Sequence, residues 1–237
     1  MKNAMRLDKL IASQTTLSRR EARQRILSGR VSVNTEVCRS IDASVMPQQD
    51  TVLLDGQAIG YQPFVYYMLH KPAGVLSASR DRRATTVLDL LNEHDRTRPL
   101  FPVGRLDKNT TGLLLLTDDG MMAHRIISPK SGIEKEYSVT LDGPVTDDMV
   151  KRFAEGITLT DGTVCASAGL TALENCRARV ILTEGKYHEI KRMFGVCGLG
   201  VNQLHRMRIG HLWLPDDLPV GEYRPISAKE LSESVFC

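Results

Sequence analysis

A run of four leucines, Leu113–Leu116, constrains the fold of this chain more than any other feature of the sequence. The run follows Gly112 and ends before Asp118-Asp119-Gly120, so residues typical of turns enclose it on both sides. A short, uninterrupted apolar run of this kind predicts a β-strand that is buried on both of its faces. We expect the loop that leads into this strand to be held rigidly against the core.

That loop carries two charged side chains, Arg105 and Asp107. A loop anchored by a buried strand is a good support for a catalytic carboxylate. An Arg-x-Asp sequence is also common as a simple ion pair on a loop, where it contributes little. The spacing alone leaves both interpretations open.

The segment 104–120 resembles the catalytic motif of the pseudouridine synthase family, and the resemblance extends over almost the whole chain. It is strongest to the branch of the family that acts on small-subunit ribosomal RNA. The resemblance implies an enzyme that isomerises a uridine of RNA to pseudouridine. The matching segments are Gly104-Arg-Leu-Asp107, Thr110 with Gly112 and the leucine run, Thr117-Asp-Asp-Gly120, Lys71-Pro-Ala-Gly74, Lys135-Glu-Tyr137 and Tyr187–Met193.

Pseudouridine formation breaks the N1–C1′ bond of a uridine, turns the base over and joins C5 to C1′. By resemblance, Asp107 is the catalytic carboxylate, which either attacks C1′ or removes a sugar proton. Lys191 matches the basic residue that pairs with this aspartate, and Tyr137 matches the aromatic residue that stacks on the flipped uracil. By spacing alone, Lys191 also fits an exposed helix position and Tyr137 a core position, so these alternatives stay open.

Three more residues are candidates for contact with the substrate. The resemblance makes Leu204 part of the wall around the base, and it implies that Arg105 holds the extruded nucleotide in place. We add Arg206, which lies on the same predicted strand as Leu204. One departure from the family pattern concerns Glu189, where many relatives have glutamine.

Positive charge is concentrated near the N-terminus. Residues 1–40 contain nine Lys and Arg against three Asp and Glu, whereas the whole chain has a net charge of only +3. Because the excess is local, it indicates an anion-binding module joined to a second, more acidic part.

The same region shows the pattern of a small helical module. Leu7, Leu10 and Ile11 have the spacing of a short amphipathic helix, and Ser18-Arg-Arg-Glu21 is a capping box for a second helix that ends at Gly29. This layout resembles the S4 RNA-binding domain, although that family commonly has glycine where Thr35 stands. The basic residues that we predict to bind RNA are Arg6, Lys9, Arg19, Arg20, Arg23 and Arg30.

The expected fold class is α+β. A small N-terminal α/β S4-like domain, residues 1–60, precedes a linker at about 58–63 and a catalytic domain, residues 64–237, which has a mixed, mainly antiparallel sheet flanked by helices. Other expected strands span 64–69, 134–141, 164–168, 178–183 and 201–209, and helices begin near Thr86, Met121, Thr146, Lys186 and Ser227.

Composition excludes several other classes of protein. With 42% hydrophobic and 25% charged residues the chain is an ordinary globular one, and it has no apolar run long enough for a membrane span and no secretory signal. We therefore expect a cytoplasmic protein, and we expect it to be a monomer. The five cysteines have no metal-site or redox spacing, His188 and His205 lack further ligands, and no nucleotide-binding motif is present, so we expect no metal and no cofactor.

The sequence thus predicts a pseudouridine synthase acting on ribosomal RNA, most simply the 16S RNA of an assembling small subunit. Large-subunit RNA is an alternative target, because relatives that act on it share the same catalytic residues. A non-catalytic ribosome-assembly factor and an RNA N-glycosidase are alternatives from other functional classes.

Overall fold

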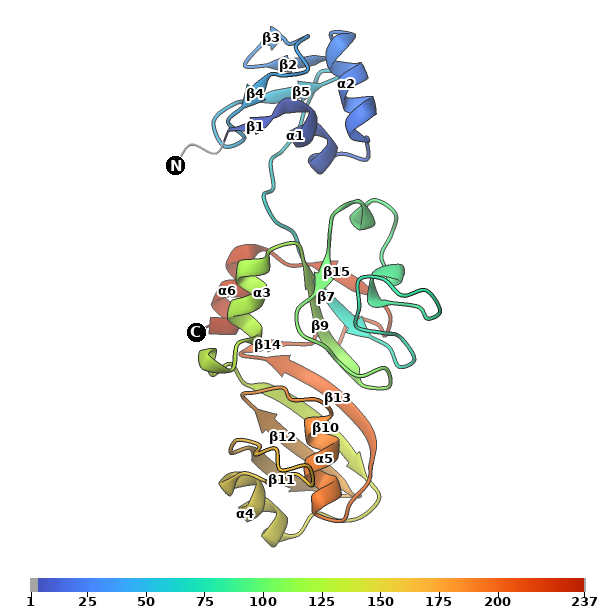
Figure 1. Cartoon of the computed structure of the whole chain (residues 1–237), viewed down its shortest axis with the longest axis vertical. Helices are drawn as coiled ribbons and strands as arrows, with labels where there is room; N and C mark the ends of the chain where they lie inside the picture. Colours follow the sequence, from blue (N-terminus) through green and yellow to red (C-terminus); the bar gives the residue numbers. More distant parts are fainter. Residues whose placement is uncertain (1–3, 237) are drawn as a thin grey trace. The chain divides into compact units, whose positions relative to one another are not determined.

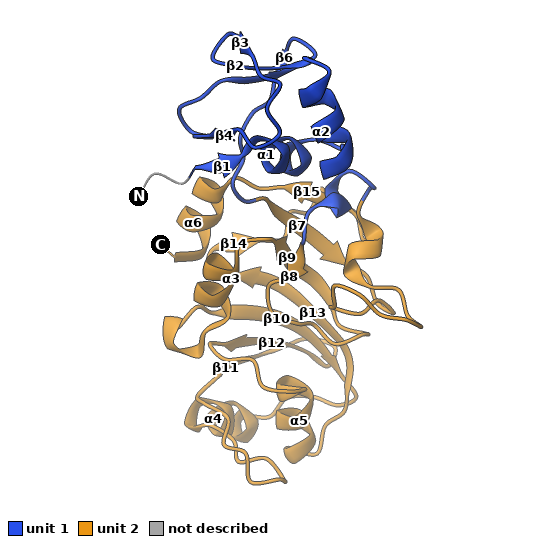
Figure 2. Ribbon diagram, turned by 45° about the horizontal axis from the view of Figure 1, so that its top comes forward, with its two compact units in different colours: residues 1–64, 92–99 blue, residues 65–91, 100–237 orange. Residues whose placement is uncertain are grey.

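The computed structural model describes residues 4–236, which form two compact units (Figure 1, Figure 2). The first unit runs to Phe64 and includes Asn92–Pro99, and the second consists of Val65–Leu91 and the chain from Leu100 onward. Each unit has hydrophobic clusters of its own, so each is described separately.

In the first unit, two helices pack on short antiparallel strands. Leu7, Leu10 and Ile11 of α1 are buried together with Ala22 and Ile26 of α2, as the spacing predicted. One sheet has the order β3-β2-β5-β6, and β1 pairs separately with β4. The elements are β1 (Met5–Arg6), α1 (Leu7–Gln14), α2 (Arg19–Leu27), β2 (Val31–Val33), β3 (Glu36–Val37), β4 (Ser44–Val45), β5 (Val52–Leu54), β6 (Gln57–Ala58) and the 3₁₀ turn η2 (Asp95–Thr97).

Both ends of α2 follow from local chemistry. The Ser18 hydroxyl accepts a hydrogen bond from the Glu21 amide at 3.2 Å, and the Glu21 carboxylate accepts one from the Ser18 amide at 2.7 Å. This reciprocal pair satisfies amides that have no partner within the helix, and it confirms the predicted capping box. After the helix, Gly29 has φ +74°, the left-handed conformation expected of a helix-terminating glycine.

The turn between β2 and β3 has a left-handed backbone at both central residues, Asn34 (φ +50°) and Thr35 (φ +76°). A two-residue hairpin turn of this kind matches the twist of its strands, but it suits glycine or asparagine. Thr35 is β-branched, so its conformation here is strained.

The second unit is built on a nine-stranded sheet. Seven of its strands follow the order β11-β12-β10-β13-β9-β7-β15, and the other two, β14 and β8, pair with β13 and β9. All of its neighbouring strands are antiparallel except β13 and β9. The strands are β7 (Tyr66–Lys71), β8 (Phe101–Pro102), β9 (Thr111–Thr117), β10 (Lys135–Leu141), β11 (Gly169–Leu173), β12 (Arg177–Leu182), β13 (Val201–Ile209), β14 (Leu212–Trp213) and β15 (Tyr223–Pro225).

Helices cover both faces of this sheet. Leu114 and Leu116 of β9 belong to a cluster that includes residues of α4 and α5, whereas Leu113 and Leu115 belong to a cluster that includes residues of α3 and α6. Figure 1 shows α3 and α6 side by side. The prediction that the leucine run is a strand buried on both faces is therefore confirmed. The helices are α3 (Gly120–Ile127), α4 (Asp147–Glu155), α5 (Glu189–Val196) and α6 (Ala228–Phe236), with 3₁₀ turns η1 (Val87–Leu90) and η3 (Pro129–Ser131).

Gly112 permits the single parallel pairing of the sheet. It lies opposite Arg206 of β13 with φ +105°, and a Cβ atom placed on it would lie 2.2 Å from the Arg206 carbonyl oxygen. Only glycine allows so close an approach of two backbones. The register between the catalytic loop's strand and β13 therefore depends on this residue.

Two sequence-based assignments in the second unit are wrong. The strand expected at 164–168 is not formed; Val164 makes only an isolated bridge with Thr158, and the edge strand is β11. The amides of Cys165 and Ala168 are instead bonded to the carbonyls of Ile157 and Phe153, so this segment is tied to α4 and the loop after it.

The helix expected from Lys186 begins three residues later, at Glu189, because His188 has a left-handed backbone, φ +50°, that no α-helix accommodates. Among residues 4–236, no helix is long and apolar enough to cross a lipid bilayer.

Candidate active site

A pocket in the second unit brings together residues from the loop between β8 and β9, β10, α5 and β13. Of the residues predicted to be catalytic or to bind the substrate, five contribute to its lining and Arg206 does not. The five are Arg105, Asp107, Tyr137, Lys191 and Leu204.

Asp107 and Lys191 form the ion pair at the centre of this pocket. The Lys191 ammonium lies 2.9 Å from Oδ2 of Asp107, and both side chains are partly accessible to solvent. Asp107 lies in the loop between β8 and β9, whereas Lys191 lies in the first turn of α5. The pair therefore holds the carboxylate at the pocket wall with one of its oxygens bonded to a cation.

His188 holds the other oxygen of the same carboxylate, because its Nε2 atom lies 3.3 Å from Oδ1 of Asp107. It is the N-cap residue of α5, and its left-handed backbone places it one turn before Lys191. Sequence reasoning considered His188 only as a metal ligand or acid–base group. Its spacing of three residues from Lys191 at the start of a helix is the signal that could have linked the two.

Lys71 is a buried lysine that bonds to the backbone of the loop carrying Asp107. It is fully buried at the end of β7, and its ammonium donates to the carbonyl oxygens of Pro72 at 2.9 Å, Lys108 at 3.1 Å and Thr110 at 2.9 Å. Burial lowers the pKa of Lys71 to about 8, although nearby Asp107 opposes this shift. Sequence reasoning interpreted Lys-Pro-Ala-Gly only as a family element and a turn, but a lysine that ends an apolar strand was a visible signal.

Tyr137 and Leu204 are both almost fully buried, and both also line the pocket. They lie on neighbouring strands, since β10 pairs with β13, and a β-bulge interrupts the register between Glu136 and Tyr137. A bulge turns a side chain relative to the regular ladder. Tyr137 is therefore at once part of the core and part of the pocket wall.

Arg105 and Arg206, the two arginines predicted to bind the substrate, differ in exposure and in their partners. Arg105 is exposed at the pocket and has no ion-pair partner among the residues described, so the simple loop pair with Asp107 is not formed. Arg206 is buried under the sheet, where its Nε donates to the Leu113 carbonyl at 2.8 Å. Its Nη2 atom has no hydrogen-bond partner within residues 4–236.

Beside the pocket lies a second cluster of titratable groups. Ligand atoms of Cys165, Glu184 and Glu189 all lie within 4.8 Å of one another, so within the described part of the chain this group could hold a metal ion. Lys186, however, forms an ion pair with Glu184 and supplies a positive charge there already. We therefore interpret the cluster as two carboxyl groups that share a proton.

The two carboxyl groups of this cluster have opposite pKa shifts. Burial, followed by the neighbouring Glu184, raises the pKa of Glu189 to about 7. Burial also opposes ionisation of Glu184, but contacts with Glu189, Lys186 and the Ala166 amide outweigh it and lower the pKa of Glu184 to about 2. A proton shared by the two carboxyl groups therefore lies on Glu189 and not on Glu184.

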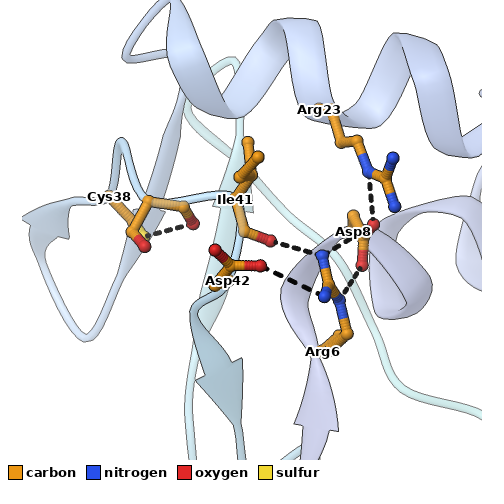
Figure 3. A network of polar contacts seen from close by, with 7 residues as sticks. Arg6, Asp8, Arg23, Cys38, Ile41 and Asp42 are labelled. Carbon is orange, nitrogen blue, oxygen red and sulfur yellow. Dashed lines mark hydrogen bonds and ion pairs between the residues drawn. The ribbon is translucent and has the colours of Figure 1, made fainter.

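In the first unit, three of the six basic residues predicted to bind RNA form ion pairs with acidic groups of the protein. The Asp8 carboxylate is completely buried, and it accepts bonds from Arg23 at 2.7 Å and Arg6 at 3.1 Å (Figure 3). Burial opposes ionisation of Asp8, but the two guanidinium groups outweigh it and lower its pKa. Arg30 also forms an ion pair, with the partly exposed carboxylate of Asp55.

The remaining candidates are Lys9, Arg19 and Arg20. All three side chains are exposed, and none has an ion-pair partner among residues 4–236. Lys9 lies on α1, and the two arginines open α2. These three cations are therefore the ones free to bind a phosphate.

Family models match both units of the chain. The model of the RNA pseudouridylate synthase family matches residues 65–195, and the model of the S4 domain matches residues 5–43. These matches define an RNA-modifying isomerase that carries an S4 domain at its N-terminal end. The predicted α+β fold class is confirmed.

Individual relatives agree with this class. Ribosomal small subunit pseudouridine synthase A of Yersinia pestis is 41% identical over 233 residues, which cover 96% of this chain and 97% of the relative. The protein of the same name from Escherichia coli (strain K12) is 42% identical, with coverage of 98% and 100%. A crystal structure of a pseudouridylate synthase has a TM-score of 0.68 at 36% identity, with coverage of 98% and 100%. The chain belongs to the RNA pseudouridylate synthase family, and the predicted reaction class is confirmed.

Proposed function

We propose that this protein converts a uridine of 16S ribosomal RNA to pseudouridine, acting as a cytoplasmic monomer on RNA of an assembling small subunit. The observation that carries the catalytic part is the Asp107 carboxylate, held by Lys191 and His188 at the wall of a pocket. The small-subunit target is supported by relatives that are named for it and that match almost the whole chain.

In this proposal, a uridine flipped out of the RNA enters the pocket with its ribose C1′ beside Asp107. The carboxylate attacks C1′ or removes a sugar proton as the N1–C1′ bond breaks, and the electron pair of that bond leaves on the uracil. The freed base turns and its C5 attacks C1′. This either breaks the bond between Asp107 and C1′ or is accompanied by return of the sugar proton from Asp107, so the carboxylate is regenerated. The C5 proton passes to solvent and N1 takes up a proton. Lys191, 2.9 Å from the carboxylate, orients it throughout.

The other pocket residues hold the nucleotide. Tyr137 stacks on the uracil from β10 and Leu204 packs against it from β13, where both already line the pocket. Arg105, exposed and unpaired among the described residues, binds the phosphate of the extruded nucleotide. Flipping a base costs a few kcal/mol, which these contacts offset.

We further propose that residues 1–60 act as the RNA-binding domain and residues 64–237 as the catalytic domain, with a linker at about 58–63. The division follows from the concentration of free cations on α1 and α2 and of the pocket residues in the second unit. The first domain supplies affinity for RNA phosphates and the second supplies the chemistry.

The test is Asp107→Asn, which keeps the size of the side chain but removes its charge. Incubated with 5-tritiated ribosomal RNA, the wild type should release tritium and the variant should release none, because an amide can neither attack C1′ nor accept a proton there. Asp217→Asn, at an exposed position of the same unit, is the matched control and should keep full activity.

The alternatives give different outcomes in the same assay. An RNA N-glycosidase would release free uracil, which mass spectrometry of the products detects. A non-catalytic assembly factor would release no tritium even as the wild type. Mapping pseudouridines in a strain that lacks the protein then identifies the target, and loss of a large-subunit site instead of a 16S site would overturn the 16S assignment.

A further inference from the structure

Tyr187 is an aromatic residue whose side chain is exposed to solvent beside the pocket that contains Asp107. Its relative exposure is 75%, against 48% for Trp213, another exposed aromatic residue of the same unit. Burial of so large a ring is ordinarily favourable. A ring kept exposed beside an RNA-modifying site is therefore a candidate contact for the substrate.

The ring is held in a defined position. It stacks on the imidazole of His188 with 3.8 Å between ring centroids and an interplanar angle of 21°. His188 in turn lies 3.3 Å from Asp107 and lines the pocket. The three side chains form a continuous series from the carboxylate to the rim of the pocket, and Tyr187 is its outermost member.

The backbone fixes this series before any substrate binds. His188 is locked in the left-handed conformation as N-cap of α5, and its carbonyl accepts the first-turn bond of the Arg192 amide at 2.9 Å. The Arg192 side chain also donates to the Tyr187 carbonyl, at 3.4 Å. A rigid aromatic contact loses little conformational entropy on binding, which favours a preorganised platform.

Charge around the ring favours RNA as the occupant. Arg105, across the pocket, is exposed and has no ion-pair partner among residues 4–236, so it is free to bind a backbone phosphate. When one nucleotide is extruded from RNA, its neighbours lose a stacking partner and expose a base face. A nucleobase next to the target is thus the apolar, flat group that Tyr187 fits.

We propose that the outer face of Tyr187 stacks on the nucleobase adjacent to the target uridine and so holds the RNA strand at the rim of the pocket. This inference rests on the proposed function, because it presumes a uridine extruded into the pocket. It assigns to Tyr187 a role in binding and leaves the chemistry to Asp107.

The first test compares Tyr187→Ala with Tyr187→Phe. Stacking of one base on an aromatic ring corresponds to roughly a tenfold change in affinity. We expect Tyr187→Ala to raise the KM for RNA about tenfold with kcat changed much less, and Tyr187→Phe to stay within about twofold of the wild type. Trp213→Ala, which removes another exposed aromatic ring of the same unit, should leave KM unchanged. Thermal unfolding of each variant excludes a folding defect.

A second test identifies the base. Synthetic RNAs carry an abasic residue on the 5′ or the 3′ side of the target, and binding is measured with each protein. With the abasic residue on one of the two sides, the RNA should bind the wild type about tenfold more weakly than intact RNA does. Tyr187→Ala should bind this abasic RNA and intact RNA equally well, because the variant has already lost the aromatic ring that the base stacks on.

Two results would overturn the inference: an unchanged KM for Tyr187→Ala, or abasic losses on both sides that are equal in the wild type and in Tyr187→Ala. Both presuppose a wild type that makes pseudouridine. A wild type that makes none contradicts the proposed function instead, so the two failures are distinguishable.

Discussion

Thr110 lies in the wall of the pocket that contains Asp107, and its buried hydroxyl has no hydrogen-bond partner within the described residues. A buried hydroxyl without a partner costs about 1–3 kcal/mol. We expect Thr110→Val, which has almost the same shape, to raise the free energy of unfolding by about 1 kcal/mol. If the hydroxyl bonds the substrate, kcat/KM should fall about tenfold at the same time.

Urea unfolding and the tritium-release assay measure the two effects of Thr110→Val separately. Full activity in a stabilised variant would show that the hydroxyl does not contact the substrate.

The Glu189 carboxyl makes stability depend on pH. Its pKa rises from 4.5 to about 7 on folding, so between these values the folded protein binds this proton and the unfolded chain does not. The contribution of Glu189 to the free energy of unfolding is therefore complete below pH 4.5 and is lost as the pH rises towards 7. Over this range the free energy of unfolding falls by up to about 1.4 kcal/mol per pH unit.

Replacement by glutamine, Glu189→Gln, should remove this slope, because an amide keeps its donor at every pH. Urea unfolding as a function of pH measures the difference from the wild type. Glu155→Gln, at an exposed position on α4, is the control and should keep the wild-type slope. Parallel pH profiles for the wild type and Glu189→Gln would contradict the assignment of the proton to Glu189.

At the scale of residues, motif resemblance singled out Asp107 and Lys191, and the structure places them 2.9 Å apart. The partners that depend on backbone conformation were harder to foresee. His188 reaches Asp107 through a left-handed backbone, and Arg206 turns under the sheet to the Leu113 carbonyl. Neither a local dihedral angle nor the face to which a long side chain turns follows from sequence spacing.

At the scale of elements, the parallel pairing of β9 and β13 gives a sharp prediction. In Gly112→Ala the new Cβ would overlap the Arg206 carbonyl and the residue would keep φ +105°, so the two strands cannot stay in place. We expect a loss of about 4 kcal/mol or more in the free energy of unfolding, or failure to fold.

Gly120→Ala is the matched control for this pairing, because nothing lies within 4 Å of its new Cβ at the start of α3. Its stability in urea should equal or slightly exceed that of the wild type. A stable Gly112→Ala protein would contradict the close approach of the two strands.

Elements with strong local signals were predicted well. The capping box at Ser18 and the uniform burial of Leu113–Leu116 are both formed as expected. The strand expected at 164–168 failed because an extended segment with a few apolar residues can satisfy its backbone against a helix as well as in a sheet. Such choices depend on partners distant in the chain.

At the scale of the whole molecule, the local excess of positive charge predicted an anion-binding unit, but it did not separate arginines with structural partners from free ones. Of the six basic residues predicted to bind RNA, Lys9, Arg19 and Arg20 are the ones without an ion-pair partner among residues 4–236. Changing all three to glutamine should weaken RNA binding and reduce the slope of log K against log salt by about 2, because about 0.7 counterion per lost contact is no longer released from single-stranded RNA.

Binding titrations at several salt concentrations measure that slope, and thermal unfolding of the triple variant should be unchanged. The contrasting variant, Arg6→Gln with Arg23→Gln, leaves Asp8 buried without its cations and should lose about 3–5 kcal/mol of stability. An unchanged salt slope in the triple variant would remove these residues from the RNA interface.

Asp107 and Lys191 are 84 residues apart in the chain, and the segment between them supplies four strands of the sheet, β9 to β12. During synthesis, the carboxylate emerges from the ribosome long before its cation does. The pair can form only after the intervening strands have assembled and α5 has docked. A prematurely terminated chain that ends before α5 therefore carries the acid without its counter-charge, so under the proposed function such a fragment would lack the paired carboxylate on which the reaction depends.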